Sequence, residues 1–123
     1  MAKIIFCEDD PSVQKLIRVA LRSTPHEIHI VGNGAEGLEL IERELPDAVF
    51  TDVSMPVLDG LQLIDELKSR PHLEHIPVVV VTASVQPHQI EEAYQHSIAG
   101  HLSKPFSVND LRAKVEQFAN THY

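Results

Sequence analysis

The sequence predicts an α/β fold, in which a five-stranded parallel sheet carries five helices on its two faces. Short apolar or β-branched runs recur along the chain, and they are continuous rather than alternating with polar residues, as in strands that are buried on both faces. Segments with the spacing of amphipathic helices separate these runs. A length of 123 residues is typical of one domain, and we expect residues 1–123 to form a single unit.

The expected strands cover residues 4–7, 28–31, 48–51, 78–82 and, with a weaker pattern, 100–102. Between and after them lie five apolar stripes at helical spacing. These are Val13, Leu16, Ile17, Ala20 and Leu21; Leu38, Ile41 and Leu45; Leu61, Ile64 and Leu67; Ile90, Ala93 and Tyr94; and Val108, Leu111, Val115 and Phe118. Ile90 and Tyr94 are predicted either as core residues or as anchors for a partner.

Local signals mark where helices begin. Asp10 before Pro11 places a capping carboxylate ahead of a proline at the first helical position. Ser107 with Asp110 resembles a capping box. Asp59 before Gly60 is interpreted as a turn and helix start rather than as chemistry.

Composition excludes several classes of protein. Eighteen acidic against ten basic residues give a net charge of -8, so we expect no direct nucleic-acid binding. The single cysteine, Cys7, excludes an internal disulfide and is interpreted as a small buried apolar residue. No apolar run approaches the length of a membrane span, and the first residues lack a signal-peptide pattern. We therefore expect a cytoplasmic protein without membrane insertion.

Polar side chains stand where the expected strands end. In an open α/β sheet this edge carries the ligand site, so Glu8, Asp9, Asp52, Thr82 and Lys104 should converge there. Two carboxylates about 4 Å apart repel by roughly 4 kcal/mol at an effective dielectric constant of about 20. With one lysine the site stays negative, so either an acid is protonated or a hard divalent cation, best Mg²⁺, neutralises it. The lysine and the hydroxyl are then suited to phosphoryl oxygens.

Four segments resemble the receiver domain of two-component response regulators. They are I-I-F-C-E-D-D-P from Ile4, D-V-S-M-P-V-L-D-G from Asp52, V-T-A from Val81 and K-P-F from Lys104. The resemblance covers nearly the whole chain, in order and at family-like spacing. It implies a flavodoxin-like, doubly wound sheet with strand order 2-1-3-4-5. It also implies a signalling domain that carries an aspartyl phosphate. We expect this domain to stand alone, because the chain ends about one turn after the last apolar stripe.

In such a receiver, Asp52 is the phosphoacceptor, whose carboxylate attacks the phosphorus of a phosphohistidine. The resemblance implies that Asp9 and Asp52 bind Mg²⁺, that Glu8 does so through water, and that the backbone carbonyl of Ser54 is a further ligand. The phosphohistidine belongs to a sensor histidine kinase or a histidine phosphotransfer protein. The expected activity is phosphoacceptance with self-assisted dephosphorylation, rather than turnover of a separate substrate.

The resemblance further implies that Lys104 and Thr82 bind the phosphoryl oxygens, and that Thr82 and His101 form a switch read by a downstream protein. Many receivers carry Tyr or Phe at the position of His101, and Gly-Ala at that of Ser97-Ile98. Because a histidine ring becomes charged below about pH 6.5, we hypothesise a pH-sensitive active state.

Two alternatives stay open for the function. The chain could be a receiver cut from a larger regulator with a DNA-binding or enzymatic output. It could also be a phosphatase with an aspartyl nucleophile, although such enzymes carry a second aspartate where this chain has Ser54.

Two other patterns receive structural interpretations. Residues 32–37 form a G-x-G-x-x-G string, but they follow the second expected strand, so we interpret them as a turn and helix start rather than as a dinucleotide site. The pairs His26 with His29 and His72 with His75 lack cysteine partners and a helical metal-binding arrangement, so we expect surface histidines.

Overall fold

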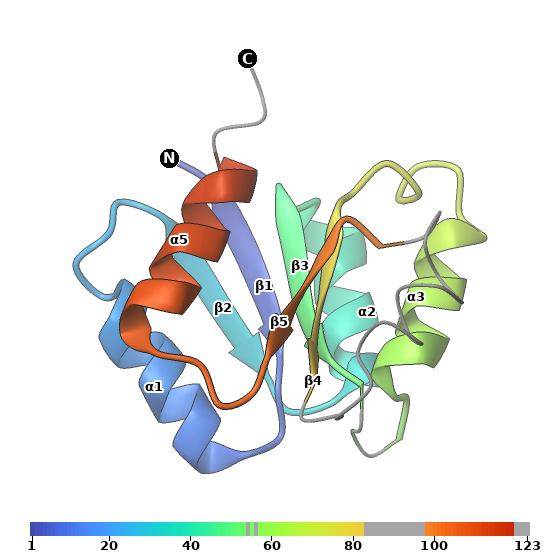
Figure 1. Cartoon of the computed structure of the whole chain (residues 1–123). Coiled ribbons are helices and arrows are strands. Elements are labelled where there is room, and N and C mark those ends of the chain that lie inside the picture. Colours follow the sequence, from blue (N-terminus) through green and yellow to red (C-terminus); the bar gives the residue numbers. More distant parts are fainter. Residues whose placement is uncertain (54, 56, 83–97, 120–123) are drawn as a thin grey trace.

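The computed structural model describes residues 1–53, 55, 57–82 and 98–119 of the chain. Its centre is a five-stranded parallel sheet in the order β2-β1-β3-β4-β5, as expected (Figure 1). The strands are β1 (Lys3–Cys7), β2 (Glu27–Val31), β3 (Ala48–Asp52), β4 (Val78–Thr82) and β5 (Gly100–Ser103). Each agrees with an expected strand to within one residue at either end.

Helices cover both faces of the sheet. They are α1 (Pro11–Leu21), α2 (Gly34–Glu44), α3 (Gly60–Lys68) and α5 (Val108–Ala119). Helices α1 and α5 lie on one face, and α2 and α3 lie on the other (Figure 1). The predicted stripe of Ile90, Ala93 and Tyr94 lies outside the described residues. In the part of the chain that is described, no helix is long and apolar enough to span a bilayer.

The two faces of the sheet have separate cores, which explains why the strands are apolar at every position. In β1, Ile4 and Phe6 face α1 and α5, whereas Ile5 and Cys7 face α2 and α3. Phe6 stacks on Phe50 of β3 with ring centroids 4.8 Å apart. Each such fully buried side chain contributes about 1.5–3 kcal/mol to folding.

The predicted helix starts are confirmed by their hydrogen bonds. The Asp10 carboxylate accepts from the amide of Ser12 at 2.8 Å. Asp59 caps α3 in a capping box with Gln62. Ser107 and Asp110 cap each other reciprocally, with both bonds at 3.0 Å. These capping residues therefore fix where each helix begins after the loop that precedes it.

The predicted stripe of α2 is wrong at its end. Leu45 lies beyond the helix, with 58% of its surface exposed and a left-handed backbone at φ 48°. Its amide closes the helix by donating to the carbonyl of Ile41 at 3.0 Å. Leu45 is therefore a C-cap, a place where glycine is usual, rather than a core residue.

The glycine string of residues 32–37 packs against other chain segments, in agreement with its structural interpretation. Asn33 caps α2 by accepting from the amide of Glu36 at 2.9 Å. A Cβ on Gly34 would overlap the carbonyl oxygen of Leu58, and a Cβ on Gly37 would overlap the sulfur of Cys7. Close approach of α2 to its neighbours accounts for these glycines, and no cofactor is needed to explain them.

Candidate functional site

Four strands deliver the predicted site residues to one edge of the sheet. Glu8 follows β1 directly, Asp52 ends β3, Thr82 ends β4, and Lys104 follows β5. Because all the strands are parallel, their carboxyl ends meet at the same edge. Glu8, Asp52 and Thr82 are buried, together with the neighbouring Thr51, whereas the other buried side chains described in the chain are apolar.

The side chain of Lys104 lies between two of these carboxylates. Its Nζ is 2.8 Å from Oδ2 of Asp52 and 2.9 Å from Oε1 of Glu8. Both are charge-assisted hydrogen bonds, the strong class of hydrogen bond in proteins. A cation from the end of β5 therefore binds the acids that follow β1 and end β3, which the sequence alone did not predict.

Three carboxylates gather at this point. Oxygens of Glu8, Asp9 and Asp52 lie within 4.8 Å of one another. Glu8 is 2% exposed and Asp52 is 8% exposed, whereas Asp9 lies on the solvent side of the group. One lysine cannot neutralise three acids, so the group keeps a negative charge. Hard oxygen ligands with this charge fit Mg²⁺.

Backbone and side-chain donors fix Glu8 in place. The amide of Asp10 donates to Oε2 of Glu8 at 3.1 Å, and Nε2 of Gln14 donates to the Glu8 carbonyl at 2.6 Å. Burial raises the pKa of Glu8, and the hydrogen bond from Lys104 only partly offsets this effect. The sequence did not predict Gln14 as a site residue, because the apolar stripe of α1 does not indicate which polar side chains of that helix reach the site.

Lys104 keeps its proton firmly. Burial alone would lower its pKa, but hydrogen bonds to Asp52 and Glu8 outweigh burial and raise the pKa above the ordinary value. The side chain therefore acts as a fixed positive charge at neutral pH.

The backbone of Asp52 is held by its neighbours. Thr51 Oγ1 donates to the Asp52 carbonyl at 3.0 Å. A Cβ on Gly60 would overlap the same carbonyl oxygen, and the Gly60 amide donates to the carbonyl of Val53 at 2.9 Å. The start of α3 thus lies directly against the end of β3. This contact explains why Gly60 follows Asp59 in the motif.

Three other predicted residues lie on β4, on β5 and in the segment before β5. The Lys104 amide donates to the Thr82 carbonyl at 2.9 Å, so Thr82 adjoins the lysine through the backbone. His101 is half-buried in β5, opposite Val80 of β4. Ile98 packs on the α2 side of the core. Ser54 and Ser97 lie outside the described residues, so the predicted carbonyl ligand of Ser54 stays a prediction.

Comparison with known proteins identifies the family. The family model described as the response regulator receiver domain matches residues 4–116. The chain belongs to this family. The receiver is 33% identical over 113 residues to the sensor histidine kinase TmoS of Ectopseudomonas mendocina, which covers 92% of the chain and 12% of TmoS. It is 32% identical over 124 residues to the transcriptional regulatory protein KdpE of Staphylococcus aureus, which covers 98% of the chain and 52% of KdpE.

Solved structures agree with this assignment. The receiver domain of the sensor histidine kinase PA1611 from Pseudomonas aeruginosa PAO1 matches with a TM-score of 0.86 and 27% identity, over 98% of each chain. That structure has a magnesium ion coordinated in its active-site cleft. The receiver spans about an eighth of TmoS and about half of KdpE, so both relatives contain much more than this fold.

One histidine of the receiver differs from expectation. The side chain of His26 is only 6% exposed, so the prediction of a surface histidine is wrong there. Its Nδ1 accepts from the Ala2 amide at 3.0 Å, and its Nε2 lies 2.6 Å from Oε1 of Glu116 on α5. His29 and His72 each lie within hydrogen-bonding distance of one glutamate. His26 thus joins the start of β1 to α5, a long-range contact that spacing in the sequence does not reveal.

Proposed function

We propose that this receiver is a Mg²⁺-dependent phosphoacceptor switch, and that Asp52 takes a phosphoryl group from a phosphohistidine. The observation that carries the proposal is the position of Asp52. Its carboxylate ends a central strand, 2.8 Å from the Lys104 ammonium and inside a group of three acids. Membership in the receiver family and a relative with magnesium in its cleft support the same function.

The metal would be held by oxygen ligands of this chain. Asp9 and Asp52 would bind Mg²⁺ directly, Glu8 through water, and Ser54 through its backbone carbonyl. The fit rests on the three acids, whose oxygens lie within 4.8 Å of one another with a single lysine to neutralise them. When bound, Mg²⁺ supplies positive charge that lowers the repulsion between Asp52 and an incoming phosphoryl group.

The transfer step needs position and charge more than covalent assistance. One Asp52 oxygen attacks phosphorus and forms a mixed anhydride, while the bond from phosphorus to the donor imidazole nitrogen breaks and the electron pair stays with the imidazole. Lys104 then exchanges its bond to Asp52 for one to a phosphoryl oxygen, and the Thr82 hydroxyl donates to another. Attack of water on the same phosphorus would reset the switch.

A docking face for the donor lies beside the site. A hollow of about 260 Å³ is lined by Val13 and Leu16 of α1 and by Lys104, Pro105 and Phe106. Apart from the lysine, these lining residues are apolar, and the hollow adjoins the residue that contacts Asp52. A sensor histidine kinase or a histidine phosphotransfer protein could cover this face while presenting its phosphohistidine.

The output of the switch would run through Thr82 and His101 to a downstream protein. A ligand can shift a two-state equilibrium only through contacts that differ between the states. Movement of the Thr82 hydroxyl toward the phosphoryl group would supply such a difference.

Two larger contexts fit the same chemistry. The chain could work alone in the cytoplasm, or as the receiver of a longer regulator or hybrid kinase. The relatives include both kinds, since this fold is only part of KdpE and TmoS, whereas the match to an uncharacterised 14.6 kDa protein of Leptolyngbya boryana, at 31% identity, covers 88% of that protein. The phosphoacceptor step is the same in both contexts.

The test is incubation of the chain with an acyl phosphate donor and Mg²⁺, followed by measurement of intact mass. We expect a gain of one phosphoryl group that is lost with a chelator and in Asp52→Asn. The matched control is Asp65→Asn, which makes the same change at an exposed position of α3 and should keep the gain. A second pair of variants compares neighbouring acids. Asp9→Asn should lose most of the mass gain. Asp10→Asn should keep the mass gain, because asparagine still caps the helix.

Persistence of the mass gain in Asp52→Asn would contradict the proposal. Rapid release of many phosphates per chain from a phosphate ester would favour the phosphatase alternative instead.

A further inference from the structure

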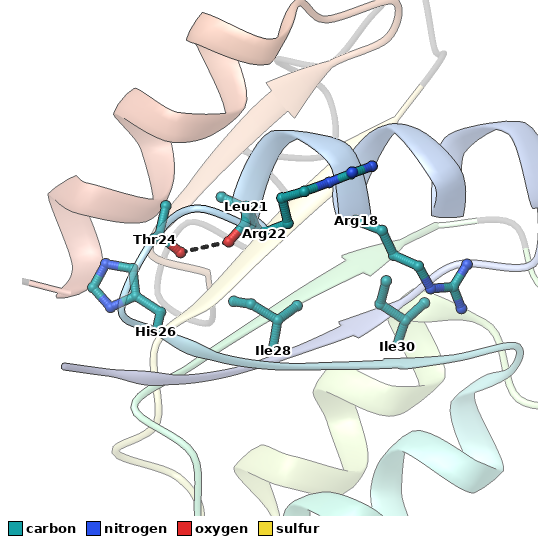
Figure 2. Close-up of a pocket in the computed structure, with 7 residues that line it drawn as sticks. All are labelled: Arg18, Leu21, Arg22, Thr24, His26, Ile28 and Ile30. Carbon is teal, nitrogen blue, oxygen red and sulfur yellow. Dashed lines mark hydrogen bonds between the residues drawn. The ribbon is translucent and has the colours of Figure 1, made fainter.

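A second pocket lies away from the carboxylate group, between α1 and the outer strand β2. It has a volume of about 410 Å³, and all its lining residues come from α1, β2 and the segment between them. Ile28 and Ile30 point from β2 toward the helix and form an apolar floor, and Leu21 lines the pocket from α1 (Figure 2). From the helical side, Arg18 lies beside Ile30, and the side chain of Arg22 runs along α1 at the rim of the pocket (Figure 2).

Within the described part of the chain, the two arginines of this pocket differ from the other three in their contacts. Among the five arginines of the chain, Arg43 and Arg70 form ion pairs with glutamates, and Arg112 donates to the carbonyl of Ala20 at 2.7 Å. Arg18 and Arg22 make no ion pair or side-chain hydrogen bond with any described residue, although the chain has 18 acidic residues. Two guanidinium groups that pair with no described residue, next to an apolar floor, suit a ligand with carboxylates on short aliphatic stems.

The neighbouring strand edge is also free. β2 pairs only with β1 among the described strands, so its other edge is open. Glu27 and Val31 direct backbone groups to β1, through the bonds of Glu27 N to the Ala2 carbonyl and of Glu8 N to the Val31 carbonyl. Since alternate residues of a strand point to opposite neighbours, Ile28 and Ile30 direct their N–H and C=O groups to the open edge. The same two residues thus supply the pocket floor and the free backbone groups.

We infer that this pocket and the free edge of β2 bind an extended acidic peptide segment of a partner protein, which adds to the sheet as a strand. The spacing of charges agrees with this ligand. Arg18 and Arg22 are four residues apart, and the backbone is still helical at Arg22. Their Cα atoms are therefore about 6 Å apart along the helix axis. Side chains on one face of a strand repeat every two residues, about 6.6–6.8 Å. A segment with Glu-x-Glu facing α1 therefore places one carboxylate near each guanidinium.

A peptide uses more of this site than a small anion does. A free carboxylate could pair with one arginine, but it would leave the backbone groups of Ile28 and Ile30 unused. An added strand bonds to them, and its glutamate stems cover the apolar floor. The site is distinct from the hollow beside Lys104 and does not depend on phosphoryl transfer.

The experiment titrates the full chain into a fluorescently labelled peptide, acetyl-Val-Thr-Glu-Thr-Glu-Thr-Val-amide, and follows anisotropy. We expect saturable binding that weakens with salt, and at least about tenfold weaker binding of the same peptide with Gln in place of both Glu residues. Arg18→Glu with Arg22→Glu should cause a similar loss. The matched control is Arg43→Glu with Lys114→Glu, which makes an equal charge change on α2 and α5 and should bind nearly as tightly. Each variant should keep the circular dichroism spectrum and the cooperative thermal unfolding of the original chain, which shows that it is folded.

Two further measurements separate strand addition from capture of a small anion. A peptide with N-methylated backbone amides should lose binding, and the amide resonances of Ile28 and Ile30 should shift most and exchange more slowly with solvent in the complex. Equal binding of the N-methylated peptide, or competition by free glutamate at similar concentration, would overturn the inference. Unchanged binding in the arginine variant would overturn it as well, and so would no saturation up to about 1 mM peptide.

Discussion

At the scale of single residues, the ammonium of Lys104 is the internal counter-ion of the site. It lies within 2.9 Å of oxygens from both Glu8 and Asp52, so these buried acids depend on it when no other cation is present. A metal ion would compete with it for the same oxygens. Lys104 therefore both stabilises the fold and weakens metal binding, two effects that substitution can separate.

Lys104→Met should lower the free energy of unfolding by about 2–4 kcal/mol in the absence of metal, because it leaves two buried carboxylates without their cation. It should also bind Mg²⁺ more tightly and gain more thermal stability from it, while accepting a phosphoryl group more slowly. Urea unfolding and thermal unfolding, with and without Mg²⁺, measure these effects.

Lys15→Met is the control for this substitution, because Lys15 is exposed and makes no ion pair with a described residue. It should change neither the free energy of unfolding nor the affinity for Mg²⁺. If Lys104→Met bound Mg²⁺ more weakly than the original chain, Lys104 would not be the competing cation.

Gly37 and Cys7 form a packing pair that can be tested by a double-mutant cycle. A Cβ on Gly37 would overlap the Cys7 sulfur, so Gly37→Ala should destabilise the chain by about 1–3 kcal/mol. In a Cys7→Ala background the overlap is gone, and the same change should stabilise by up to about 1 kcal/mol, because alanine is the better helix former. Urea unfolding of the four chains gives both values. Equal effects in the two backgrounds would show that the sulfur is not the obstacle.

At the scale of elements, the sequence was most informative about strands and helix starts. Buried parallel strands such as β4 are apolar throughout, and capping residues such as Asp10 and Asp59 act on amides two or three residues away. Both signals are local, so they can be recognised without knowing the tertiary structure. The site residues could then be predicted from the strands, because parallel strands bring their carboxyl ends to the same edge of the sheet.

The exact end of a helix and the contacts with distant residues were not predictable in the same way. The spacing of Leu45 continues the α2 stripe, but the chain has already turned into a left-handed conformation there. The burial of His26 depends on Glu116, which lies 90 residues further along. The bridge of Lys104 to both Glu8 and Asp52 depends on the order of three strands. Periodicity carries no information about such contacts.

The end of α2 offers a test at this scale. Leu45→Gly should raise the free energy of unfolding by about 0.5–1 kcal/mol, because glycine adopts φ 48° without a Cβ penalty and the exposed leucine side chain contributes little packing. Leu45→Ala is the control, since it removes the side chain but keeps the Cβ. Denaturant unfolding compares the two variants. A gain of equal size in Leu45→Ala would contradict the backbone explanation.

At the scale of the whole molecule, the topology assembles a site that no single segment contains. Residues from the ends of β1, β3 and β5 meet although they are separated by dozens of positions in the chain. The apolar cores on both faces hold these strand ends in place. Global stability and site geometry are therefore linked through residues such as Cys7, which is buried directly before Glu8.

This linkage predicts a pH dependence of global stability. Burial raises the pKa of the Cys7 thiol from 9.0 to about 12. Between these values the unfolded chain releases a proton that the folded chain keeps, so stability present below pH 9 is lost as the pH rises. The stability difference between the original chain and Cys7→Ala should shrink by about 1.4 kcal/mol between pH 8 and pH 10. Urea unfolding of both chains under reducing conditions measures this stability difference. A difference that stays constant between pH 8 and pH 10 would contradict a raised pKa of the Cys7 thiol.

The most direct measurement is the position of the phosphoryl group. The chain is incubated with an acyl phosphate donor and Mg²⁺, the product is reduced with borohydride, and its peptides are sequenced by mass spectrometry. Reduction converts an aspartyl phosphate to homoserine. The proposed function predicts homoserine at position 52 and at no other aspartate. Homoserine at Asp9 or Asp10, or at no position despite a gain of mass, would contradict it.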